Sequence, residues 1–112
     1  MHPHLPFNRP KVLLLTAGHF TVDIYPGLIP PLLPLIQTKM GLSLTETAFI
    51  SSLMVVASSF SQTLFGYISD KYRKTVLVAS GPVIAGICMS TIGWLDNYYM
   101  LLLWVFIGAI GI

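Results

Sequence analysis

Apolar residues run along the chain in four long stretches that short polar segments separate. The stretches cover residues 12–38, 45–69, 75–95 and 98–112, and the last is still apolar at Ile112. A helix that crosses the hydrocarbon core of a bilayer needs about 20 mostly apolar residues. The pattern therefore predicts three membrane-spanning helices and a fourth that is truncated, all preceded by a short polar tail over residues 1–11.

Short motifs within these stretches predict where the helices begin, kink and pack closely. The segment "SLTE", residues 43–46, predicts a capping box at the start of the second helix, with a hydroxyl and an acid three residues apart. The first stretch contains four prolines, each of which removes a backbone donor, and we expect that helix to kink. In the third stretch, small residues recur at spacings that favour close helix packing: Gly81, Ala85, Gly86, Ser90 and Gly93.

Composition supports a chain that lies in lipid. Hydrophobic residues make up 54% of the sequence and charged residues 9%, whereas a soluble domain is typically about one-quarter charged. The net charge of +2 comes from a few clustered cations, which argues against nucleic-acid binding. No phosphate loop, catalytic triad or metal-ligand spacing is present, so we expect no enzyme, no metal site and no cofactor. The fold class predicted is an all-α integral membrane protein.

The cations also predict an orientation. With the N-terminus in the cytoplasm, only Lys39 among the cations lies outside, and the others lie inside: Arg9, Lys11, Lys71, Arg73 and Lys74. This imbalance follows the positive-inside rule and argues against a dual topology. We expect a multi-pass protein of the inner (plasma) membrane.

Polar residues of the first stretch recur at steps of three and four and so share one helix face. They are Thr16, His19, Asp23, Gly27, Pro30 and Pro34. An acid within a membrane is costly unless it faces a bundle interior or an aqueous cavity, which makes Asp23 a candidate functional residue. Its nearest partner is His19, one turn away, and because His titrates near neutral pH the pair suits proton relay. The alternative is that both residues only hydrogen-bond the helix to its neighbours.

A second polar stripe follows the second stretch, through Ser51, Ser58, Gln62 and Ser69. Both stripes could line one cavity, in which Gln62 would contact the substrate or proton pathway. Serines also join membrane helices by hydrogen bonds without any role in transport, and that alternative stays open.

The segment "GYISDKYRKT", residues 66–75, connects the second and third stretches. Asp70 falls at the C-terminal end of a helix, where the macrodipole disfavours an anion, and the neighbouring cations would either solvate it or anchor the loop. Its pattern resembles the signature loop of the major facilitator superfamily: glycine, three residues, Asp, a basic residue, any residue, glycine and two basic residues. Arg73 stands where glycine is expected, and Thr75 where the last cation is expected.

Two longer segments, "GHFTVDIYPGLIPPLLPLI" (residues 18–36) and "FSQTLFGYISDK" (residues 60–71), resemble the fosmidomycin-resistance branch of that superfamily. The resemblance implies the N-terminal three to four helices of a twelve-span carrier that exports a small molecule or drug, driven by a proton gradient as an antiporter. It implies that the remaining helices of the carrier are partners, besides lipid and substrate, and that this part does not transport alone. Gly66, Asp70, Lys71, Arg73 and Lys74 would form a conformational-switch loop, in which Asp70 meets the positive N-terminus of a helix from the second half.

Two other interpretations stay open at this point. A self-contained small multidrug transporter has a similar length and four spans, and would act as a dimer around an acid in the first span. A membrane subunit that does not transport would use the polar stripes for packing alone.

Overall fold

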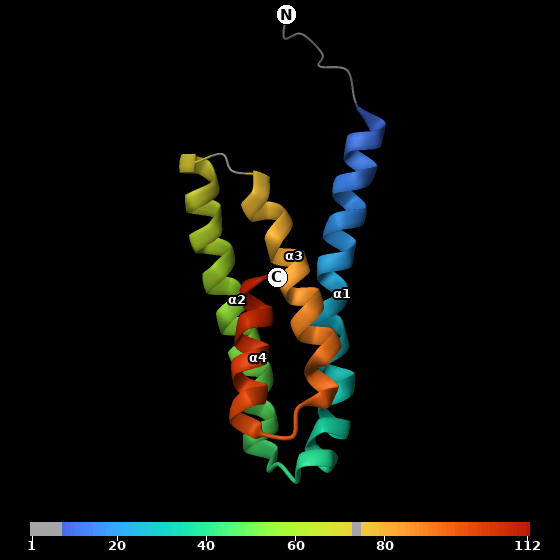
Figure 1. Ribbon diagram of the computed structural model, residues 1–112, viewed down its shortest axis with the longest axis vertical. Helices are drawn as coiled ribbons and strands as arrows, with labels where there is room; N and C mark the ends of the chain where they lie inside the picture. Colours follow the sequence, from blue (N-terminus) through green and yellow to red (C-terminus); the bar gives the residue numbers. More distant parts are fainter. Residues whose placement is uncertain (1–7, 73–74) are drawn as a thin grey trace, which may run out of the picture.

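The computed structural model describes residues 8–72 and 75–112, and within them every regular element is a helix. The elements are α1 (Arg9–Met40), α2 (Leu44–Tyr72), α3 (Thr75–Thr91), the short 3-10 helix η1 (Ile92–Trp94) and α4 (Tyr98–Ile110). They run up and down alongside one another (Figure 1). We call the end where α1 meets α2 the Lys39 end, and the end where α2 leads into α3 the Asp70 end.

The helix α1 begins three residues earlier than the apolar pattern indicates, at Arg9. The side-chain oxygen of Asn8 accepts a hydrogen bond from the backbone N–H of Lys11 at 3.4 Å, and Pro10 occupies the first turn, where its missing N–H costs nothing. At the other end Gly41 adopts a left-handed conformation with φ 64°, which closes the helix at little steric cost. The element remains one helix through its four internal prolines.

The predicted capping box of α2 is confirmed. Glu46 Oε2 accepts the backbone N–H of Ser43 at 2.8 Å, and Ser43 Oγ accepts the backbone N–H of Glu46 at 3.2 Å. These bonds satisfy donors that the first turn of a helix leaves without partners. The helix continues to Tyr72, so Asp70 lies in its last turn, as predicted.

The third helix ends earlier than predicted, at Thr91 instead of residue 95, and η1 follows it. Asn97 then starts α4, because its side-chain oxygen accepts the backbone N–H groups of Tyr99 at 2.9 Å and Met100 at 3.2 Å. An Asn at this position supplies the acceptor that the first turn needs.

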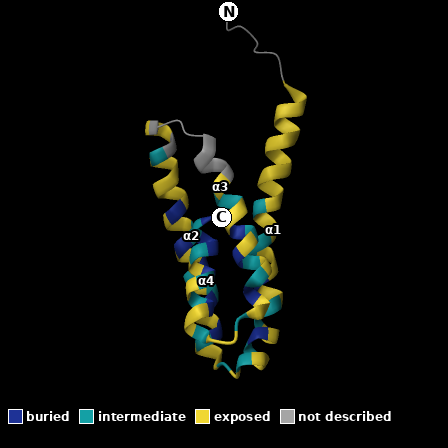
Figure 2. Cartoon of the chain, in the orientation of Figure 1, coloured by how far each residue is buried: buried dark blue, intermediate teal, exposed yellow. Residues whose placement is uncertain are grey.

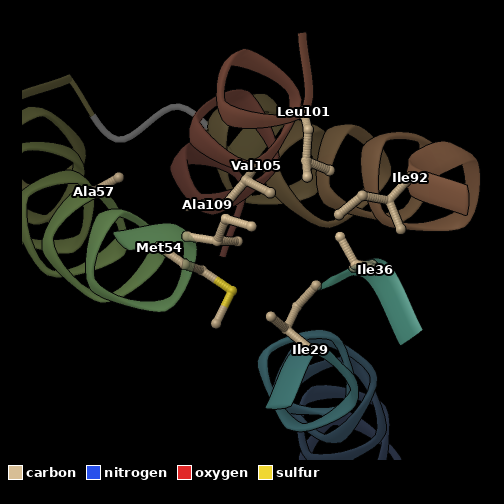
Figure 3. Close-up of a cluster of buried hydrophobic side chains, with 9 residues drawn as sticks. Ile29, Ile36, Met54, Ala57, Ile92, Leu101, Val105 and Ala109 are labelled. Atoms are coloured by element: carbon tan, nitrogen blue, oxygen red, sulfur yellow. The ribbon is translucent and has the colours of Figure 1, made fainter. Parts of the chain in front are cut away.

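The hydrophobic core gathers toward the Lys39 end (Figure 2), and Figure 3 shows its side chains in close-up. Its members come from α1, α2, η1 and α4: Ile29, Ile36, Ile50, Met54, Ala57, Ile92, Leu101, Val105 and Ala109. The N-terminal half of α1 is exposed throughout residues 9–21, as Figure 2 shows. The four helices are therefore packed together at one end, while α1 stands free of them toward the other.

Small residues bring α3 and α4 into backbone contact, as their spacing predicts. A Cβ atom added to Gly81 would lie 2.8 Å from the carbonyl oxygen of Gly111, and Ala85 on the same side of α3 is fully buried. Gly86 approaches α1 instead, because a Cβ there would lie 2.8 Å from the hydroxyl of Tyr25. The prediction is wrong for Gly93, which has open space around it.

Polar contacts tie the connections together at the Lys39 end. Lys39 Nζ lies 2.7 Å from Asp96 Oδ1 and donates to the carbonyl oxygen of Gly93 at 2.9 Å. The hydroxyl of Tyr98 donates to the carbonyl oxygen of Glu46 at 3.2 Å. These bonds join the α1–α2 connection to the α3–α4 connection.

Candidate functional site

A cleft of about 680 Å³ opens between the helices toward the Asp70 end. Its wall is mainly apolar, with leucines of α1, Phe65 of α2 and Ile110 of α4 among its members. Four polar side chains also line it: His19, Thr21, Gln62 and Ser80. The volume falls within the range of about 300 to 1,000 Å³ that is usual for small-molecule pockets.

The predicted pair of titratable groups forms within α1. His19 Nε2 lies 3.5 Å from Asp23 Oδ2, and the two side chains are 80% and 62% exposed. The spacing of four residues puts both on one side of the helix, one turn apart. His19 reaches the cleft, and Asp23 lies next to it toward the Lys39 end.

The polar face that contains this pair is exposed along α1, and His19 at its edge borders the cleft. Its six members are all exposed: Thr16, His19, Asp23, Gly27, Pro30 and Pro34. The opposite side of α1 packs through Ile29 and Ile36, which are 1% and 8% exposed. Within residues 8–72 and 75–112 neither His19 nor Asp23 bonds to another helix, so a hydrogen-bonded lock between described helices is not present.

Members of the predicted polar stripe along α2 differ in their surroundings. Gln62 is exposed and lines the same cleft as His19, so side chains from the two predicted stripes meet there. Ser58 is turned back onto its own helix, where its hydroxyl donates to the carbonyl oxygen of Val55 at 3.1 Å. Sequence reasoning did not single out Thr21 and Ser80, which also line the cleft, because neither residue fits the periodicity of the stripes.

A comparison with protein families identifies the chain. The model of the Major Facilitator Superfamily matches residues 12–112. The chain belongs to this superfamily. No curated protein and no solved structure matched.

Membership of the major facilitator superfamily supports a role in membrane transport. Two described helices, Arg9–Met40 and Leu44–Ile68, are long and apolar enough to cross a bilayer. A member of the major facilitator superfamily is not a small multidrug transporter. The family match therefore favours the facilitator interpretation over a self-contained small multidrug transporter that acts as a dimer.

The facilitator-like loop lies at the Asp70 end. Gly66, Asp70 and Lys71 are exposed in the last turns of α2, and a Cβ added to Gly66 would meet nothing within 4 Å. Arg73 and Lys74, which were predicted to complete the loop, lie outside the described residues, as do residues 1–7 of the predicted tail. Among the residues that are described, no group of His, Cys, Asp and Glu is arranged to hold a metal ion.

Proposed function

We propose that this chain forms the N-terminal part of a proton-coupled carrier that exports a small molecule, of the fosmidomycin-resistance type. The observation that carries the proposal is the His19–Asp23 pair, which forms on the open side of α1 and adjoins the cleft. A carboxylate at membrane depth requires water or a polar partner, and here His19 of the same helix is that partner.

The position of the pair along α1 suits proton exchange with the cytoplasm. Asp23 lies about 24 Å from Lys39 at 1.5 Å of rise per residue, so it lies well past the middle of a hydrocarbon core that is about 30 Å thick. With the Lys39 end outside, protons would reach the pair from the cytoplasmic side, and His19 would lie on that side of Asp23. The imidazole, with Nε2 at 3.5 Å from Asp23 Oδ2, can then relay a proton between the cytoplasmic side and the carboxylate.

The open face of α1 also supports a partner within the same carrier. Facilitators place three-span repeats around a midplane site and transport by rocking one half against the other. We propose that the second half covers the polar face of α1 and forms the remaining wall of the cleft. Gly66, Asp70, Lys71, Arg73 and Lys74 would then contact that half at the cytoplasmic surface in one conformational state, and Gln62 would contact the substrate.

The test is Asp23→Asn in the complete carrier that contains this segment. The amide keeps the shape of the side chain and loses its titration, so export of fosmidomycin from cells and its dependence on the proton gradient should both be lost, with normal membrane insertion. Asp96→Asn is the matched control, because Asp96 is an exposed acid in the α3–α4 connection and should leave the coupling unchanged. Coupled export by Asp23→Asn that is unchanged between about pH 6 and 8 would refute the proton role.

A further inference from the structure

The prolines of α1 deprive part of its backbone of hydrogen bonds. In a regular α-helix the carbonyl oxygen of each residue accepts from the N–H of the residue four positions later. Proline has no N–H to donate, and α1 contains four internal prolines: Pro26, Pro30, Pro31 and Pro34. The carbonyl oxygens that lose their donor in this way are those of Val22, Pro26, Gly27 and Pro30. Two of these residues, Gly27 and Pro30, are exposed.

The carbonyl of Gly27 loses more than the others. A helical carbonyl can also accept from the N–H three residues later, as in a 3-10 turn, but here Pro30 occupies that position and Pro31 the next. Gly27 has no side chain that could shield its oxygen, and a Cβ added to it would meet nothing within 4 Å. Its carbonyl oxygen therefore lies in open surroundings without either of its helical donors.

The hydroxyl groups of α1 satisfy other carbonyls. Thr21 Oγ1 donates to the carbonyl oxygen of Ala17 at 2.8 Å, and Thr38 Oγ1 donates to that of Pro34 at 2.9 Å. A carbonyl without a donor is costly in hydrocarbon, and carbonyls freed by proline are satisfied by neighbouring helices, by Ser or Thr side chains, or by ordered water. The Gly27 carbonyl therefore requires a donor from outside α1.

The freed carbonyls continue the row that the titratable pair begins. His19, Asp23 and Gly27 follow one another at steps of four, which places them on one side of the helix, and Pro30 belongs to the same exposed face. Gly27 lies about 18 Å from Lys39 at 1.5 Å of rise per residue, close to the middle of a hydrocarbon core about 30 Å thick. The row therefore extends from Asp23 toward the Lys39 end, on the side opposite to His19.

Water fits this row of oxygens better than a metal ion or a single side chain. A hard cation needs about six oxygens around one point, whereas these oxygens are spread along the helix. Gly27 and Pro30 are separated by about 4.5 Å of rise, and one water with hydrogen bonds of about 2.8 Å can join two oxygens at such a separation. A side chain that donates to one carbonyl would leave the next without a donor.

We propose that the carbonyl oxygens of Gly27 and Pro30 bind water, and that this water conducts protons between Asp23 and the Lys39 end. When the carboxyl group of Asp23 loses its proton, the O–H bond broken there is replaced by one formed on the first water. That water releases another proton to the next, and the last releases one to the outside. The carbonyl oxygens accept hydrogen bonds throughout and exchange no proton. The conducting role rests on the proposed proton coupling, whereas the binding of water does not.

The first experiment measures water at Gly27 directly, by solid-state NMR of the whole chain in phosphatidylcholine vesicles. Glycine labelled with ¹³C at its carbonyl and leucine labelled with ¹⁵N select two bonds, because glycine precedes leucine only at Gly27–Leu28 and Gly41–Leu42. Gly41 is exposed in the α1–α2 connection and serves as the internal reference. Magnetisation should pass from water to the Gly27 carbonyl at a rate of the same order as to that of Gly41.

Two proline substitutions separate this binding from a general change in the helix. Pro31→Ala restores the N–H that α1 would direct at the Gly27 carbonyl, so transfer from water to Gly27 should fall several-fold while transfer to Gly41 is unchanged. Pro26→Ala is the matched control, because it removes a proline from the same helix but supplies a donor to Val22 instead. Far-UV circular dichroism checks that both variants are helical.

The second experiment tests conduction in the complete carrier that contains this segment, with fosmidomycin as the probe. Pro31→Ala should slow export driven by a proton gradient several-fold and leave the exchange of fosmidomycin without a gradient unchanged. Pro26→Ala should change neither rate. A merely structural role for Pro31 would slow both processes together.

The outcomes distinguish this proposal from the proposed function. A Gly27 carbonyl that receives no magnetisation from water overturns the proposal, as does a transfer rate that Pro31→Ala leaves unchanged. Normal gradient-driven export in Pro31→Ala overturns the conducting role, and if Asp23→Asn still abolishes coupling, the proposed function stands. Coupled export that survives Asp23→Asn would overturn the proposed function and the conducting role together, while the NMR result would decide the binding of water by itself.

Discussion

The close contact between α3 and α4 allows a quantitative test through Gly81→Ala. The added methyl group would lie 2.8 Å from the carbonyl oxygen of Gly111 and 3.5 Å from its carbonyl carbon. Both atoms belong to the backbone, so a side-chain rotation cannot relieve the clash. The two helices must move apart by several tenths of an ångström, which loosens their contacts on both sides of the glycine.

The expected free-energy change follows from two opposing terms. Overpacking a tight interface costs about 1 to 3 kcal/mol. Replacing glycine by alanine within a helix returns up to about 1 kcal/mol. With the full helix-propensity gain, the net loss should therefore be about 0 to 2 kcal/mol. Gly66→Ala is the matched control, because Gly66 also lies within a helix but has nothing within 4 Å of the added methyl, so only the favourable term applies.

The assay is unfolding of the chain from mild detergent by added SDS. Trp104 provides a local probe, since its Nε1 donates to Thr91 Oγ1 at 2.8 Å and so links α4 to α3. Gly81→Ala should lower the SDS fraction at the midpoint and alter Trp104 emission before unfolding, in a Trp94→Phe background. Gly66→Ala should raise the midpoint or leave it unchanged.

The close contact also predicts that substitutions on its two sides do not have additive effects on the free energy of unfolding. A methyl group on Gly111 would contact Gly81 and Ala85 across the same gap, so helices that one substitution has already separated accommodate the second more easily. The double variant Gly81→Ala with Gly111→Ala should cost less than the sum of the single variants. A midpoint for Gly81→Ala equal to that of Gly66→Ala would refute the close contact and the reasoning built on it.

Two further predictions concern orientation and the loop. In a Cys88→Ser background, Leu44→Cys should react with an impermeant thiol reagent from outside intact cells, and Lys11→Cys should react only after permeabilisation; the reverse result would contradict the topology. Asp70→Asn should change the unfolding midpoint of this chain less than Gly81→Ala does, because Asp70 is exposed, yet it should shift cavity accessibility in the complete carrier. Strong destabilisation of the chain with no such shift would make Asp70 a local structural residue.

Local signals in the sequence were sufficient for much of the fold. The capping box at Ser43 and Glu46 and the position of Asp70 in the last turn of α2 follow from nearby residues, and the structure confirms both. The early start of α1 was missed because the tail looks polar, although Asn8 and Pro10 are a helix-start signal. The contact between Gly81 and Gly111 joins distant segments, so spacing predicted a close approach without naming its partner.

The sequence predicts that His19 and Asp23 pair, but it does not predict what their face of α1 meets. A spacing of four residues is enough to bring His19 to Asp23, but it does not decide whether that face meets another helix, water or lipid. In a membrane the choice is not set by hydrophobicity, because lipid tails are as apolar as a protein interior. Which face of a helix meets its neighbours depends instead on where small and polar residues allow the helices to approach. On α1 the contacting face is the side of Tyr25 and Ile29, because Gly86 of α3 leaves room for the tyrosine hydroxyl.

This packing gives α1 two mechanically different parts. Toward the Lys39 end it is held by Ile29 and Ile36 in the core and by the contacts of Lys39. Toward the Asp70 end, residues 9–21 are exposed. His19 lies in the exposed part and Asp23 close to where packing begins, so a movement of the free half of α1 would change the surroundings of His19 more than those of Asp23. Under the proposed proton coupling, in a carrier that rocks about its midplane, such a boundary would allow a proton held at the pair to be released when the cleft closes, and Asp23→Asn tests that proposal.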